Sequence, residues 1–277
     1  MKKNLSFDFR VLSTNTRFFW VLVFCIISGF LLPFFLYFGN AISSLGHTYD
    51  AFWFYNSNTR ALSFAFSVSL SLFAVLGNAT IYLEESRFVS NIFTRCKKRS
   101  YYISKFIVTF FSGFLITFTF LVLNYLNTYL LIGANKVNIS YNIFVVKVNN
   151  PFLTNAMYVF PKLWASNPNL NIACYILLYS ILSGFISYAT FGLSLVIQNR
   201  IIVYLGATLF ALLTAAIFNI ISSPIQLWYW INVFDPFPLT RYDTPATIYL
   251  AIMISWFFIL FCFGLFTSNY NNRQDVI

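Results

Sequence analysis

Charged side chains are scarce in this chain of 277 residues. Asp, Glu, Lys and Arg together make up 9% of the sequence, whereas a typical soluble domain contains about 25%. Hydrophobic residues account for 59%, and the mean hydropathy is +0.74. Because so few polar side chains cannot cover a water-soluble globule, the composition excludes a soluble enzyme, a disordered chain and a disulfide scaffold. It leaves an integral membrane protein.

Catalytic and metal-binding groups are also few. The chain has a single histidine, His47, and four cysteines with no paired spacing. It lacks the G-x-x-x-x-G-K-[ST] motif of nucleotide-hydrolysing proteins and the H-E-x-x-H motif of zinc proteases. We therefore expect no catalytic residue, no metal site and no bound cofactor on this chain, and no enzyme activity of its own.

Long apolar runs dominate what is present. A helix needs roughly 20 mostly apolar residues to cross a hydrocarbon core of about 30 Å. Six runs reach that length and contain no Asp, Glu, Lys, Arg or His: 18–38, 61–83, 106–131, 172–197, 201–221 and 248–266. They lack the alternating polarity of outer-membrane barrel strands. The sequence predicts an all-α integral membrane protein with six transmembrane helices in one transmembrane domain, 1–277.

The basic residues are divided unequally between the two sides of this predicted bundle. Of the 17 Lys and Arg residues, 12 lie in the N-terminus, the loops at 84–105 and 198–200, and the C-terminus. Lys and Arg accumulate in cytoplasmic loops, so both termini are predicted to be cytoplasmic. The high Phe, Ile, Asn and Tyr content is typical of AT-rich bacterial genomes. We therefore expect a multi-pass protein of a bacterial cytoplasmic membrane, with no nucleic-acid partner.

Three segments outside the runs have recognisable patterns. Leu5, Phe9 and Leu12 are at helical spacing with Asp8 elsewhere, which favours an amphipathic N-terminal helix on the inner leaflet; a disordered basic tail is the alternative. Residues 225–234 are apolar and aromatic but too short to span, which favours an outer interfacial or re-entrant helix before the last span. Residues 132–171 form a long external loop.

The cytoplasmic loop 84–105 combines acidic, apolar and basic residues. Two acids end the second run, an amphipathic stretch follows, and a basic cluster precedes the third run. These residues are Glu84 and Glu85, then Phe88, Ile92 and Phe93, and then the basic Arg87, Arg95, Lys97, Lys98 and Arg99. Topology explains the basic residues but not the acids. We expect a short helix at 84–99 that docks on a cytoplasmic partner; the alternative is a helix held by anionic lipid.

The fifth run contains small residues at a regular spacing. Ala207, Ala211 and Ala215 are four residues apart and so share one helix face. Small side chains allow helix backbones in membranes to approach closely. The row predicts a close helix contact, either at a dimer seam or within one bundle.

Taken together, these features resemble the membrane subunits of type-2 ABC exporters, the ABC-2 permeases. The similarity rests on the amphipathic N-terminal stretch, the outer helical segment before the last of six spans, and the passage between the second and third spans. That passage reads Glu84 or Glu85, then Arg99, Tyr101 or Tyr102, and Lys105.

The resemblance implies a mechanism and partners. Two permease subunits, identical or different, pair in the membrane, and a cytoplasmic ATPase that binds ATP and Mg²⁺ sits beneath each. The helix between spans two and three docks on that ATPase and transmits its closure to the bundle. Substrates of the family include drugs, peptides, bacteriocins, lipids and cell-envelope polymers.

Two other functions are compatible with the sequence. One is an accessory or immunity subunit that binds a membrane partner without transport. The other is a passive channel or a sodium-coupled carrier with a site of carbonyls and hydroxyls. An ATPase encoded next to this chain and purifying with it would favour the exporter.

Overall fold

The structure is a computed structural model that describes residues 2–38, 72–77, 79–85, 92–94, 97–132, 163, 167–220 and 246–274. These residues form helices and short connections, with no strand among them. The helices are α1 (Lys2–Thr14), α2 (Thr16–Phe38), α5 (Ile81–Glu85), α7 (Lys98–Ile132), α11 (Pro168–Val196), α12 (Arg200–Ile220) and α15 (Ala246–Gln274). Four of them, α2, α7, α11 and α15, are long and apolar enough to cross a membrane.

The predicted all-helical fold is thus confirmed for the described part of the chain, and the four long apolar helices support the predicted membrane protein. The first, third, fourth and sixth apolar runs are these four long helices. The fifth run coincides with α12, a helix of 21 residues. Residues 39–71, the outer segment 225–234 and most of the loop 132–171 lie outside the described residues.

The second run departs from the continuous helix that its hydropathy predicts. Residues 72–76 are helical, a turn follows at Gly77 and at 79–80, and α5 then begins at Ile81. Glycine weakens a helix interior because it has the most backbone freedom to lose. At this turn the Thr80 and Tyr204 hydroxyls lie 2.6 Å apart, which joins the turn to α12.

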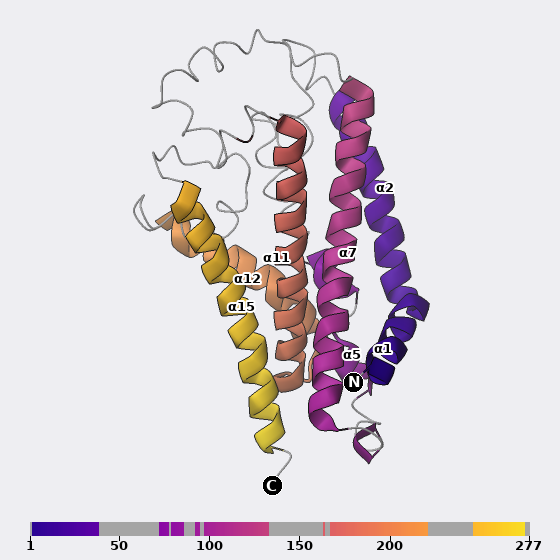
Figure 1. The fold of residues 1–277 in the computed structure, drawn as a ribbon, viewed down its shortest axis with the longest axis vertical. Coiled ribbons are helices and arrows are strands. Elements are labelled where there is room, and N and C mark those ends of the chain that lie inside the picture. The colour runs from indigo at the N-terminus through magenta and orange to yellow at the C-terminus, as the bar shows by residue number, and fades with distance from the viewer. Residues whose placement is uncertain are drawn as a thin grey trace.

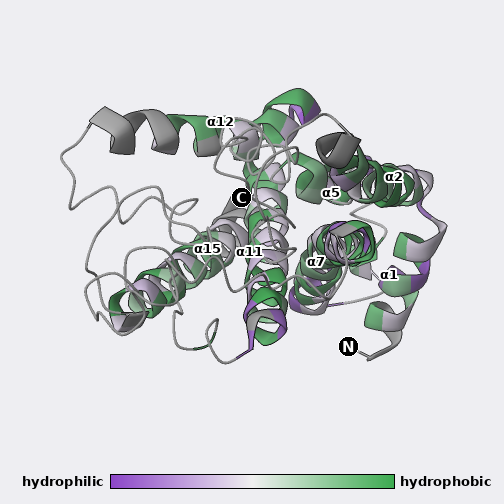
Figure 2. Cartoon of the chain, turned by 90° about the horizontal axis from the view of Figure 1, so that it is seen from above, coloured by the Kyte–Doolittle hydropathy of each residue, from purple (hydrophilic) through white to green (hydrophobic). Residues whose placement is uncertain are grey.

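The bundle is arranged around α7 and α11, which stand side by side (Figure 1). α2 packs on the other side of α7, and α15 packs on the other side of α11. α12 follows α11 after a connection of three residues, 197–199, and then diverges from it (Figures 1 and 2). The Asn199 side chain accepts a hydrogen bond from Ile201 N at 3.0 Å, which caps the start of α12.

Small residues bring α7 and α11 into close contact. A Cβ added to Gly113 would lie 2.7 Å from Ser187 Cβ and 2.8 Å from the Ser183 carbonyl oxygen, so only glycine fits there. One turn further along, the Thr117 and Ser183 hydroxyls are 2.5 Å apart. Close backbone approach with hydroxyls bonding across it is typical of helix packing in membranes.

The N-terminal helix α1 lies across the lower end of the bundle. Figure 2 shows α7 and α2 nearly end-on, while α1 runs sideways beside them. It packs mainly on α7, where the rings of Phe9 and Phe111 are 5.8 Å apart. Leu12 is buried, as the predicted apolar face requires, but so is Asp8, three residues after Leu5 on the same side. The end of α15 lies at this same end of the bundle (Figure 1).

Candidate functional site

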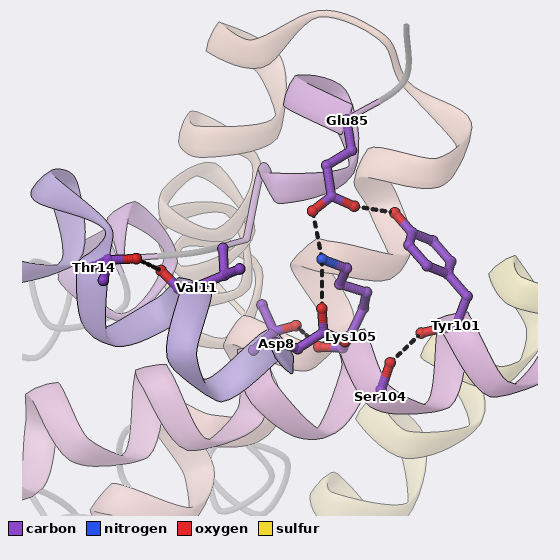
Figure 3. A network of polar contacts seen from close by, with 8 residues as sticks. Asp8, Val11, Thr14, Glu85, Tyr101, Ser104 and Lys105 are labelled. Carbon is purple, nitrogen blue, oxygen red and sulfur yellow. Dashed lines mark hydrogen bonds and ion pairs between the residues drawn. The ribbon is translucent and has the colours of Figure 1, made fainter. Parts of the chain in front are cut away.

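A buried lysine near the start of α7 is the centre of a charged cluster. Lys105 is 2% exposed, and its ammonium nitrogen is 3.0 Å from Asp8 Oδ1 and 2.5 Å from Glu85 Oε1. Asp8 belongs to α1 and Glu85 to α5, so the three side chains connect three helices (Figure 3). Asp8 is also buried, whereas the Glu85 side chain is 23% exposed.

Tyr101 completes the cluster from the same face of α7. Its hydroxyl donates to Glu85 Oε2 at 2.6 Å, and the Lys105 ammonium lies 5.4 Å from the centre of its ring. Residues four apart on a helix are neighbours, which brings Tyr101 and Lys105 to one carboxylate. Ser104 Oγ donates to the Tyr101 carbonyl at 2.9 Å. Both oxygens of Glu85 therefore accept a donor from α7, and the end of α5 is fixed against that helix (Figure 3).

A second ion pair joins the adjacent acid to the start of α2. Glu84 pairs with Arg17, whose side chain is 50% exposed, while that of Glu84 is 34% exposed. Exposed pairs of this kind contribute between about 0 and 1 kcal/mol. The structure thus gives both acids of the loop a partner within the chain. The accumulation of Lys and Arg in cytoplasmic loops explains the basic residues of this loop but neither of its acids.

The buried cluster holds its helices more firmly than the exposed pair can. Removing one partner of a buried ion pair typically costs about 3–5 kcal/mol, because the remaining charge has lost its counterion. The Asp8–Lys105–Glu85 cluster has two carboxylates around one ammonium, so loss of Lys105 would leave both of them without it. The Asp8–Lys105–Glu85 cluster, called the charged joint below, therefore connects α1 and α5 to α7.

An aromatic cluster extends this joint toward the segment at 92–94. Ile92 and Phe93 are partly buried against a core that includes Tyr101 and Tyr102. The Phe93 ring is 5.5 Å from that of Tyr101 and 6.1 Å from that of Tyr102, and the Lys98 ammonium lies 5.2 Å from the Phe93 centroid. Two of the three residues predicted to form the apolar side of this segment, Ile92 and Phe93, therefore pack on the chain's own helix α7.

The same core continues into α11. The Phe106 ring is 4.4 Å from that of Tyr188 and 4.9 Å from that of Phe191. Tyr188 in turn stacks on Phe261 of α15 at 5.9 Å. The segment at 92–94 thus packs on the same buried cluster of α7 and α11 residues to which Phe106, Tyr188 and Phe191 belong, and Tyr188 extends the contacts to α15.

The other predicted site residues are placed as follows. Lys97 and Arg99 are exposed beside the joint. Arg87, Phe88 and Arg95 lie outside the described residues. Ala207 lines a cavity between α11, α12 and α15. Ala211 and Ala215 lie in α12, but their side chains are not among those described.

Sequence reasoning missed Asp8 and Arg17 as partners of the acidic and basic residues of the loop. Asp8 was placed away from the apolar face of its helix, whereas it faces Lys105. Its spacing offered a clue, because Leu5, Asp8 and Leu12 follow the i, i+3, i+7 pattern of one helix face. In a chain with 7 acidic residues, an acid on that face is a candidate for a buried ion pair.

Among the residues that the structure describes, no group of His, Cys, Asp and Glu could hold a metal ion. Comparisons of the chain with protein-family models, with curated proteins and with solved structures find no match. The functional interpretation therefore depends on the sequence pattern and on the geometry of this joint.

Proposed function

We propose that this chain is the membrane-spanning permease subunit of an ATP-driven exporter of the ABC-2 type. In this proposal it has six spans with both termini cytoplasmic, and it pairs with a second permease subunit in a bacterial cytoplasmic membrane. A separate ATPase subunit binds ATP and Mg²⁺ and supplies the energy. The cargo is a peptide, a drug, a lipid or a component of the cell envelope.

The observation that carries the proposal is the charged joint of Asp8, Lys105 and Glu85. The six apolar runs contain no ionisable Asp, Glu, Lys, Arg or His, so no such group within them can change charge with an ion gradient. A cytoplasmic ATPase supplies energy without any such group in the spans. The joint connects the only sizeable cytoplasmic loop of the predicted topology to three helices at once.

The distribution of charge along the described helices supports this reading. Charged residues occur in α1, at the start of α2, in α5, in the first turns of α7, at the start of α12 and near the end of α15. These parts gather at the lower end of the bundle (Figure 1). Such one-sided placement fits a cytoplasmic face against which a soluble subunit docks.

The contacts suggest how a docked ATPase would act on the bundle. The docking region is the predicted segment 84–99, with Lys97 and Arg99 exposed toward the partner. Closure of the ATPase pushes this segment, and Phe93 transmits the push to α7 through Tyr101 and Tyr102. Glu84 and Glu85 hold the segment in register on the bundle through Arg17 and Lys105.

Co-purification tests the proposal directly. The tagged full-length chain, solubilised from the membranes of its own host, is expected to retain a Walker-motif ATPase that hydrolyses ATP in the purified complex. Phe88→Asp should release the ATPase while the chain remains inserted, because a carboxylate cannot occupy an apolar docking surface without a large desolvation cost.

Phe88→Leu is the matched control, since it keeps the apolar side chain and should retain the partner. If no ATPase accompanies the wild-type chain, the exporter assignment is wrong. If the ATPase stays bound to Phe88→Asp, residues 84–99 are not the docking region.

A further inference from the structure

A cavity of about 270 Å³ lies between α11, α12 and α15, away from the charged joint. Leu193 lines it from α11, Ala207 and Phe210 from α12, and Trp256 and Phe263 from α15. The lining segments of α11 and α15 belong to two of the long apolar helices that can cross a membrane. The cavity therefore lies among the membrane-spanning parts of the chain.

The cavity exists because α12 and α15 both pack on α11 but make few contacts with each other. α15 approaches α11 closely, since a Cβ added to Gly192 would lie 3.2 Å from Gly264 Cα. α12 diverges after the short connection from α11 (Figure 2). It meets α15 where the Phe210 and Trp256 rings are 6.2 Å apart.

Two small residues of α12 leave the space between α12, α11 and α15 unfilled. Gly206 and Ala207 are adjacent on α12 and both line the cavity. The nearest atom to a Cβ added at Gly206 would be Leu193 Cδ2, at 3.0 Å. Larger side chains at these two positions would occupy the space that is now open.

The chemistry of the lining is that of hydrocarbon. Among the described residues that line the cavity, only Thr190 and Trp256 carry a polar side-chain atom. The Thr190 hydroxyl donates to the Ile186 carbonyl at 2.8 Å, and the Trp256 indole has a single N–H donor. A buried water needs two to four polar partners, and an apolar cavity of about 150 Å³ stays dry and is large enough to bind benzene. Neither water, an ion nor a polar solute is stabilised here, and an empty cavity forfeits the dispersion contacts of its lining.

We infer that an acyl chain of a membrane lipid occupies this cavity as a bound ligand. The cavity is partly open and its lining is apolar. The solvent around membrane-spanning helices is itself acyl chain. A helix of a second copy is the weaker candidate, because it is about 10–12 Å wide with its side chains. The space between α12 and α15 closes where the Phe210 and Trp256 rings meet, 6.2 Å apart, which is less than the width of a helix. The inference is independent of the proposed transport function, since it needs neither an ATPase nor a cargo.

Trp256 provides a probe inside the cavity. In a chain whose other tryptophans are replaced by phenylalanine, Trp256 fluorescence is measured in vesicles of phosphatidylglycerol with brominated acyl chains, which quench tryptophan on contact. Ala207→Phe should fill the cavity and reduce the quenching. Leu209→Phe is the matched control, because Leu209 lies on the same helix, is 50% exposed and does not line the cavity. It should leave the quenching unchanged.

A second measurement tests retention of the lipid. Native mass spectrometry of the purified wild-type chain and of Leu209→Phe should show a lipid that survives delipidation, and Ala207→Phe should lose it. If Ala207→Phe does not accumulate in the membrane, Gly206→Leu fills the same space from the neighbouring position.

Two results would overturn the inference. Equal quenching and equal lipid retention in the filled and control variants would mean that no chain enters the cavity. Conversion of a wild-type dimer to a monomer by Ala207→Phe, with lipid retention unchanged, would mean that a helix of a second copy occupies it. Absence of a co-purifying ATPase would refute the exporter proposal and leave this result unaffected.

Discussion

Lys105 is the central residue of the charged joint. It meets Asp8 from α1 and Glu85 from α5 while being 2% exposed. An apolar side chain of similar length could fill its space but could not neutralise the two carboxylates. The chain offers a natural comparison, because Arg17 pairs with Glu84 at a position where the arginine side chain is 50% exposed.

We predict that Lys105→Met lowers the free energy of unfolding by about 3 kcal/mol, the lower end of the range for broken buried ion pairs. The lower end applies because the Glu85 side chain keeps 23% exposure and water can reach it. Thermal unfolding in detergent micelles measures the loss. Arg17→Gln also removes one positive charge, but from an exposed pair, so it should cost no more than about 1 kcal/mol. Equal effects of the two substitutions would show that the buried cluster does not stabilise the fold.

Among the elements, α12 departs furthest from the rest of the bundle. It begins at a side-chain cap on Asn199, packs on α11 near Gly206 and then diverges. The small-residue row of α12 therefore has two environments. Ala207 lines a cavity within the chain, whereas the next two members of the row lie further along the helix, beyond Phe210. A role of the row at a dimer seam thus concerns Ala211 and Ala215.

We predict that Ala211→Phe disrupts assembly of two copies, because a large side chain at a small-residue contact forces the helix backbones apart. Chemical crosslinking in native membranes followed by size analysis measures the dimer. Leu213→Phe is the control, since Leu213 is already large and is 60% exposed. Normal dimer formation by Ala211→Phe would mean that this position faces lipid or the chain's own helices.

At the scale of the whole molecule, the orientation in the membrane is the property that most constrains function. The segments predicted to be cytoplasmic carry 12 of the 17 basic residues, and the helix ends that hold the described ones gather at one end of the bundle. Each basic residue near a span favours the cytoplasmic side, and their sum sets the topology.

We predict that Lys97 is cytoplasmic, while Lys136 and Lys162 are external. Single-cysteine variants at these positions, made in a chain without its four native cysteines, are treated in intact cells with a membrane-impermeant maleimide. Lys136→Cys and Lys162→Cys should be labelled, and Lys97→Cys should react only after the cells are opened. Labelling of Lys97→Cys in intact cells would invert the topology and remove the proposed docking surface from the cytoplasm.

The sequence by itself determined the class of protein and four long helices. α2, α7, α11 and α15 were predictable because the free energy of placing a helix in a membrane is nearly a sum over its own residues. The ends of these helices were less predictable. α7 begins at Lys98, eight residues before the apolar run, since backbone hydrogen bonding continues into the polar segment.

Only the tertiary structure decided what the polar residues do. Asp8 and Lys105 are far apart in the chain, and nothing local says that α1 would cross α7 at that lysine. The interruption of the second run at Gly77 and the cavity beside Ala207 have the same origin. They depend on the shapes of side chains on several helices that meet only after folding. Hydropathy is a property of a single segment, so it can be calculated from the sequence of that segment. Packing and ion pairing are properties of two segments in contact, so they cannot be predicted from either segment by itself.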